Sequence, residues 1–125
     1  MAESWCAMKK WFITIIILLL PNISHAWDKM DTALQLTYLG LHVMDWGQTL
    51  DIAKSPNKHE ELNPILGKHP SIDKVNSYFV LTGVGHTVIS LLLPKPYRNY
   101  WQLITIGIES NCVYHNYRMG VRINF

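Results

Sequence analysis

Charged residues are scarce in this chain: they make up 16% of its 125 residues, against roughly 25% in typical soluble domains. Hydrophobic residues reach 49%, and the net charge is only +2. No cluster of lysines and arginines is present, so the sequence predicts no nucleic-acid-binding face. The length allows one domain. This composition favours a small membrane protein that contacts the lipid bilayer.

The sequence also lacks the short motifs that identify common catalytic and metal sites. It contains no His-x-x-x-His, Cys-x-x-Cys, Gly-x-Ser-x-Gly or phosphate-binding loop. Cys6 and Cys112 are its two cysteines. Because Cys6 falls in the expected leader, a disulfide framework is excluded.

Residues 1–26 have the pattern of a bacterial secretory signal peptide. Lys9 and Lys10 precede an apolar run at 11–20, and Ser24-His25-Ala26 places small residues at the positions that signal peptidase requires. Ten apolar residues are too few to cross a bilayer core of about 30 Å. We expect cleavage before Trp27, with an uncleaved anchor as the alternative. The true start of the chain is either Met1 or Met8.

The remaining domain, residues 27–125, predicts an all-α fold: a signal peptide followed by a three-helix transmembrane bundle. The spans are expected near 31–53, 75–93 and 100–117. In the first span a narrow polar stripe runs along one face, and apolar residues cover the wider remaining arc of the helix. A surface helix of a soluble protein has the reverse pattern. The stripe comprises Gln35, Tyr38, His42, Asp45 and Thr49. A soluble secreted domain is the alternative.

The ends of the spans carry helix start and stop signals. Asp31 or Thr32 can cap the first span, Ser71 can cap the second, and Pro94 ends it. In the connection at 54–74, Glu61 or Asn63 either caps the end of the first helix or folds back toward Thr49. Capping is the favoured interpretation.

Basic residues predict the orientation of the bundle in the bacterial inner membrane. With the mature N-terminus outside, three spans place residues 54–74 and the C-terminus in the cytoplasm. Six lysines and arginines then lie inside and three outside, in agreement with the positive-inside rule.

Each span has one ionisable residue near its middle: Asp45, His86 and Glu109. A charged aspartate at the centre of a bilayer costs about 2.5–3.5 kcal/mol, so such groups are paired, neutral or functional. They are candidates for a structural cluster, for a catalytic site that binds a divalent transition metal, or for a proton path. The structural interpretation is favoured. The expected cluster also includes Gln48, Thr49, Glu61, Asn63 and Asn116.

Two short motifs resemble a family of small uncharacterised prokaryotic helical membrane proteins. They are Asp-x-x-x-Thr, here Asp45 and Thr49, followed by Glu-x-Asn-Pro, here Glu61, Asn63 and Pro64. The resemblance covers about 20 residues. It implies a helical membrane fold and no particular activity.

Three functions are compatible with this sequence. The first is a non-enzymatic accessory or interaction component, in which Gly83, Gly85 and Gly107 serve helix packing or self-association. The second is an intramembrane metal-dependent hydrolase that uses Asp45, His86 and Glu109. The third is a proton or ion path formed by an oligomer.

Overall fold

A computed structural model describes residues 27–125, which form three α-helices and, within that range, no strand. The helices are α2 (Lys29–Lys54), α3 (Ile72–Leu92) and α4 (Tyr97–Arg118). The predicted all-α fold is therefore confirmed, and each expected span matches one helix to within three residues at either end. The predicted signal peptide lies outside the described residues.

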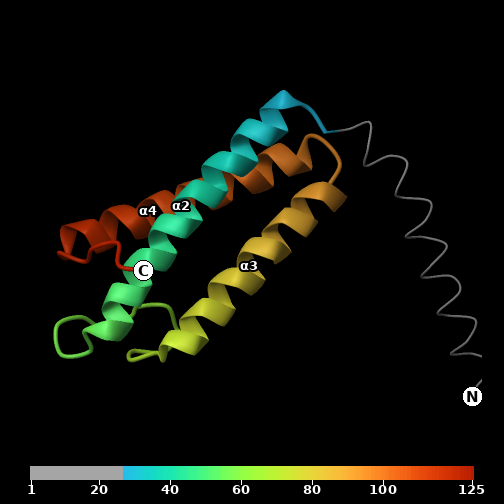
Figure 1. Ribbon diagram of the computed structural model, residues 1–125. Helices are drawn as coiled ribbons and strands as arrows, with labels where there is room; N and C mark the ends of the chain where they lie inside the picture. The colour runs from blue at the N-terminus through green and yellow to red at the C-terminus, as the bar shows by residue number, and fades with distance from the viewer. Residues whose placement is uncertain (1–26) are drawn as a thin grey trace, which may run out of the picture.

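Helix α2 is the central element of the bundle. It packs against both α4 and α3, whereas α3 and α4 touch each other at few points (Figure 1). The connection between α2 and α3 lies at one end of the bundle, together with the C-terminus. The start of α2 and the short turn from α3 to α4 lie at the other end, which we call the turn end.

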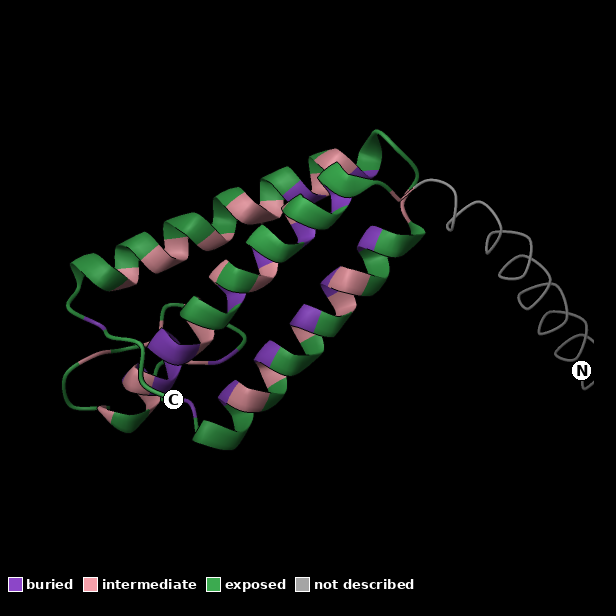
Figure 2. Ribbon diagram, turned by 45° about the horizontal axis from the view of Figure 1, so that its top comes forward, coloured by how far each residue is buried: buried purple, intermediate pink, exposed green. Residues whose placement is uncertain are grey.

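Polar side chains form a large part of the buried interior of this bundle. Buried residues lie on the helix faces that oppose one another, and exposed residues cover the outer faces (Figure 2). The exposed set includes large apolar side chains on every helix, such as Leu36, Leu81 and Ile104. The buried polar residues are Asp31, Gln35, His42, Gln48, Thr49, His86, Ser90, Arg98 and Gln102. The buried apolar residues are Tyr38, Leu50, Ile52, Leu66, Val75, Phe79 and Val121.

Of the helices described, α3 alone is long and apolar enough to cross a membrane by length and composition. The polar side chains of α2 and α4 lower the hydropathy of those two helices. Many of these side chains, including Gln35 and Gln102, lie inside the bundle. Others, such as Asn111 and His115 of α4, are exposed.

The caps differ in part from expectation. Asp28, rather than Asp31 or Thr32, caps α2: its side chain accepts from the Asp31 amide at 2.9 Å, and Asp31 accepts from the Asp28 amide at 3.0 Å. This reciprocal pair is a capping box. Ser71 caps α3 as predicted, accepting from the Lys74 amide at 3.2 Å.

The connection between α2 and α3 is held by its own hydrogen bonds. Glu61 Oε1 accepts from the Asn63 amide at 2.8 Å, and Asn63 Oδ1 accepts from the Ile65 amide at 2.9 Å. These bonds form a local turn within the connection. Helix α2 itself ends at Lys54, and Ser55 is its C-cap residue. The favoured prediction that Glu61 or Asn63 caps α2 is therefore wrong. The apolar core lies beside this turn and contains Leu50, Leu66, Val75 and Phe79.

Residues 121–125, which we call the strap, run back along α2 after the chain reverses at Gly120. Gly120 has φ 81°, a conformation that favours glycine. The Asn124 amide donates to the Gly47 carbonyl at 3.0 Å, and the Arg122 amide donates to Asp51 at 3.0 Å. Glycine at position 47 allows this approach, because an added Cβ would lie 2.6 Å from Ile123 Cγ2.

Candidate functional site

The three ionisable candidates do not meet in one cluster. Asp45 and Glu109 line the same cavity, whereas His86 is not among its lining residues. His86 Nε2 lies 2.8 Å from Thr105 Oγ1, and its Nδ1 lies 3.2 Å from Gln35 Nε2. Its ring stacks on Tyr38 with centroids 3.5 Å apart. The predicted triad of Asp45, His86 and Glu109 is thus divided between two places.

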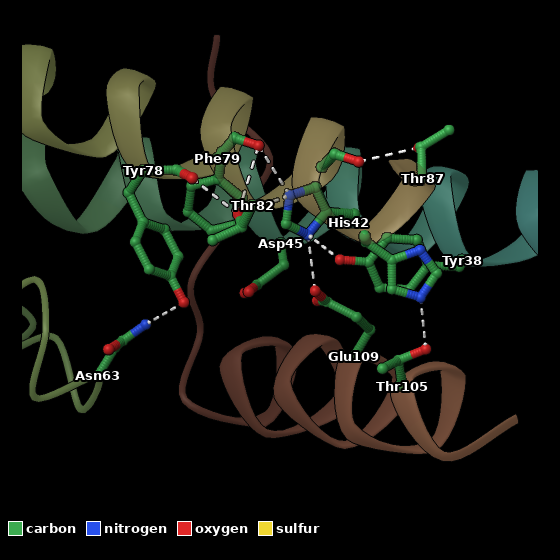
Figure 3. Close-up of polar contacts among 12 residues, drawn as sticks. Tyr38, His42, Asp45, Asn63, Tyr78, Phe79, Thr82, Thr87, Thr105 and Glu109 are labelled. Carbon is green, nitrogen blue, oxygen red and sulfur yellow. Dashed lines mark hydrogen bonds and ion pairs between the residues drawn. The ribbon is translucent and has the colours of Figure 1, made fainter. Parts of the chain in front are cut away.

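His42 is the histidine that partners Glu109. Its Nδ1 lies 2.6 Å from Glu109 Oε1, and its Nε2 lies 3.0 Å from the Phe79 carbonyl oxygen (Figure 3). A carbonyl only accepts, so Nε2 carries a hydrogen. The short contact at Nδ1 then requires a second proton, held by either the imidazole or the carboxyl group. In both arrangements the pair as a whole is neutral.

Asp45 lies on the next turn of α2 and points into the same space as Glu109 (Figure 3). Its Oδ1 accepts from Asn116 Nδ2 of α4 at 2.9 Å. On the opposite side, Asn63 of the connection donates to the Tyr78 hydroxyl of α3 at 2.8 Å. Three helices and the connection therefore each contribute polar groups to one region.

A cavity of about 440 Å³ occupies this region. Its size falls within the range of small-molecule sites, which is about 300–1,000 Å³. Six of the eight predicted cluster residues line it: Asp45, Thr49, Glu61, Asn63, Glu109 and Asn116. Its apolar walls include Leu62, Leu66, Phe79 and Ile108.

The alternative prediction has Glu61 folding back toward Thr49, and the cavity that both residues line agrees with it. Glu61 and Thr49 line the same cavity, although they lie in different segments. Gln48, by contrast, is not among the lining residues, and its Nε2 donates to the Val113 carbonyl at 3.2 Å.

A bound metal gains no support from the described part of the chain. No group of three or more histidine, cysteine, aspartate or glutamate side chains among residues 27–125 is arranged to hold a metal ion. A divalent transition metal at Asp45, His86 and Glu109 would need His86 to reach the cavity.

The turn end of the bundle holds a second polar cluster that sequence reasoning missed. Arg98 is 1% exposed and Asp31 is fully buried. Arg98 Nη1 donates to Asp31 Oδ2 at 2.9 Å, and Gln102 Nε2 donates to the Asp31 carbonyl at 3.1 Å. The sequence offered one signal for this pair: opposite charges at the starts of two helices that short connections place at the same end.

An exposed ion pair flanks this cluster. Lys95, in the turn between α3 and α4, donates a hydrogen bond to Asp28. The lysine holds the pKa of the Asp28 carboxyl below its ordinary value, and Asp28 raises the pKa of Lys95. The pair joins the turn to the start of α2.

Comparisons with models of known protein families, with curated proteins and with solved structures find no match. The resemblance carried by Asp45, Thr49, Glu61, Asn63 and Pro64 stays a prediction. The fold and the two polar clusters define the class of object: a three-helix bundle with buried polar clusters, exposed apolar side chains on its helices and an acid-lined cavity.

Proposed function

We propose that this protein is a small integral membrane protein whose three helices all cross the bilayer, and that it acts as a non-enzymatic accessory or interaction component. One observation carries the proposal: polar side chains pair inside the bundle, while large apolar side chains cover its outside. In water this distribution would leave much apolar surface exposed. In lipid it is the favourable arrangement.

Helix length supports the proposal. At 1.5 Å per residue, the 21 residues of α3 extend about 32 Å. The 26 residues of α2 and the 22 of α4 are longer. Each helix is therefore long enough for a hydrocarbon core of about 30 Å.

The interior contacts support a structural role for the buried polar groups. Gln35 of α2 donates to Thr87 of α3 at 3.0 Å, and His86 of α3 lies 2.8 Å from Thr105 of α4. In lipid, hydrogen bonds of this kind hold helices together, because there is no hydrophobic drive between them. These groups thus join all three helices.

The proposed orientation follows from the basic residues, with the turn end outside the bacterial inner membrane and the α2–α3 connection in the cytoplasm. Residues 1–26 act in this proposal as a signal peptide that is cleaved before Trp27.

The proposal includes self-association through two of the three glycines considered, Gly85 and Gly107. Space around Gly85 and Gly107 is open, since an added Cβ would meet no atom within 4 Å. Gly83 is used inside the bundle, where an added Cβ would lie 3.3 Å from His42.

The metal-dependent hydrolase has less support from the geometry, because His86 lies outside the cavity that holds Asp45 and Glu109. The proton or ion path requires an oligomer and stays a prediction.

Two measurements test the proposal. The protein should stay with the membrane pellet after alkaline carbonate extraction. In a background without Cys6 and Cys112, Lys95→Cys should react with an impermeant maleimide in intact spheroplasts, and Lys58→Cys should react only after permeabilisation. Release by carbonate, or equal labelling of both cysteines, would overturn the proposed insertion or orientation.

A further inference from the structure

The acid-lined cavity has a charge pattern that points to a ligand. The side chains that line it, all within the described range, include no lysine or arginine. Three carboxyl groups from three different segments line it: Asp45 on α2, Glu61 in the connection and Glu109 on α4. Glu109 is paired with His42, whereas Asp45 and Glu61 have no basic side-chain partner among the described residues.

Several polar groups in this cavity lack partners in the described part of the chain. Glu61 Oε2 and Glu109 Oε2 are both buried and accept no hydrogen bond there. Thr49 is 2% exposed and lines the cavity, and no hydrogen bond to its side-chain hydroxyl is present among residues 27–125. Buried polar groups in folded proteins are normally satisfied. Two buried carboxyl oxygens of this kind around one cavity, together with a threonine hydroxyl that makes no hydrogen bond in the described chain, indicate that a donor belongs there.

The spacing of the carboxyl groups favours an extended donor over a single ion. No three acidic or histidine groups of the described chain are arranged to hold one metal ion. Leu62, Leu66 and Ile108 give the cavity an apolar wall, which suits a short hydrocarbon chain. Tyr78 and Phe79 add aromatic rings that can interact with an ammonium group.

We propose that the cavity formed by α2, α3, α4 and the 55–71 connection binds an aliphatic diamine, with one ammonium group near Glu61 and the other near Asp45 and Glu109. The two ammonium groups can each reach a carboxyl group of the cavity, and their N–H groups supply donors to Glu61 Oε2 and Glu109 Oε2, which accept no hydrogen bond within the described chain. The hydrocarbon linker lies against the apolar wall. The proposal does not depend on insertion of all three helices in a membrane.

The test uses the purified full-length protein in detergent and isothermal titration calorimetry with 1,4-diaminobutane. We expect saturable binding with one site per chain. Butylamine, with one ammonium group, should bind about tenfold more weakly or worse at the same ionic strength. Mg²⁺ should not compete at equal concentration. A magnesium ion that competes fully, or butylamine that binds equally well, would overturn the proposal.

Matched variants locate the site. Glu61→Gln keeps the oxygen that accepts from the Asn63 amide but removes the charge. Glu60→Gln is the control, because Glu60 is an exposed neighbour outside this cavity and the substitution changes the net charge equally. We expect Glu61→Gln to weaken binding about tenfold and Glu60→Gln to leave it unchanged.

Equal weakening by both variants would assign the binding to diffuse charge and refute the site. Helical circular dichroism of each variant shows that it is folded, and Glu61 lies outside the helices, so its substitution leaves their packing intact. Absence of saturable binding to the folded wild-type protein would also refute the proposal. Carbonate extraction is independent of both results and reports on membrane insertion alone.

Discussion

Replacing Arg98 with methionine tests the buried polar cluster at the turn end. The Arg98 side chain is 1% exposed, and its guanidinium group donates hydrogen bonds to α2 and to the end of α3. Its Nη1 bonds Asp31 Oδ2 at 2.9 Å, its Nε bonds the Ser90 carbonyl at 2.7 Å, and its Nη2 bonds the Leu93 carbonyl at 2.8 Å. Both carbonyls belong to the end of α3, where the helix itself provides no donors. Arg98 therefore joins α2, α3 and α4 at one point.

The expected loss can be worked out from these contacts. Methionine preserves most of the aliphatic volume and removes every donor. The carboxylate of Asp31, which is fully buried, then loses its arginine and keeps only the partly exposed Lys95, whose Nζ lies 3.5 Å from Asp31 Oδ2. Removing one member of a buried ion pair typically costs about 3–5 kcal/mol. We expect Arg98→Met to lower the free energy of unfolding by about 3 kcal/mol or more.

The assay is reversible unfolding in mixed detergent micelles, followed by circular dichroism. Arg118→Met is the matched control, since Arg118 lies at the other end of α4 and is exposed; it should change stability by at most about 0.5 kcal/mol. Combining Arg98→Met with Asp31→Asn should recover part of the loss, because the uncompensated charge is gone. A loss below about 1 kcal/mol for Arg98→Met, or no recovery in the double variant, would refute this reasoning.

Three further predictions concern the strap, His86 and the exposed ion pair. Gly47→Ala should displace the strap and increase hydrogen exchange at residues 121–124, whereas Gly40→Ala, in open space on the same helix, should stabilise by about 0.5–1 kcal/mol. Faster exchange with both variants would contradict the close approach at Gly47. His86→Leu should lower the melting temperature and leave diamine affinity unchanged, because His86 is not a cavity residue; a large loss of affinity would argue against the site. The hydrogen bond from Lys95 lowers the pKa of the Asp28 carboxyl from 3.8. The ion pair therefore stabilises the folded protein above pH 3.8, and this contribution is lost as the pH falls through the pKa that Asp28 has in the folded protein. The melting temperature of the Asp28→Asn variant should consequently change less with pH in this acid range than that of the wild-type protein. The same pH dependence in both proteins would contradict the pairing of Asp28 with Lys95.

Much of the fold was predictable because helix signals are local. Apolar runs, the Ser71 cap and Pro94 gave the three helices and their approximate ends. The grouping of Asp45, Thr49 and Glu61 was also predictable, since a turn directly after α2 places the connection beside the end of that helix.

The pairing inside the bundle was not predictable from the sequence. Whether Glu109 meets His42 or His86 depends on how each helix is rotated about its axis, and tertiary packing sets that rotation. Arg98 is one of the three basic residues that the sequence places outside, yet its side chain is buried and donates to the Leu93 carbonyl at the end of α3. Local pattern gives the face on which a residue lies but not its partner across the interface.

Spin labelling tests the central claim most directly. Labels at Leu36→Cys, Leu81→Cys and Ile104→Cys place one probe on the outward face of each helix, at positions 64%, 71% and 61% exposed. In reconstituted bilayers, the account predicts that all three labels are relaxed strongly by oxygen and weakly by a water-soluble nickel complex. Strong relaxation by the nickel complex on α2 and α4 would show that those helices lie in water and would contradict the three-span bundle.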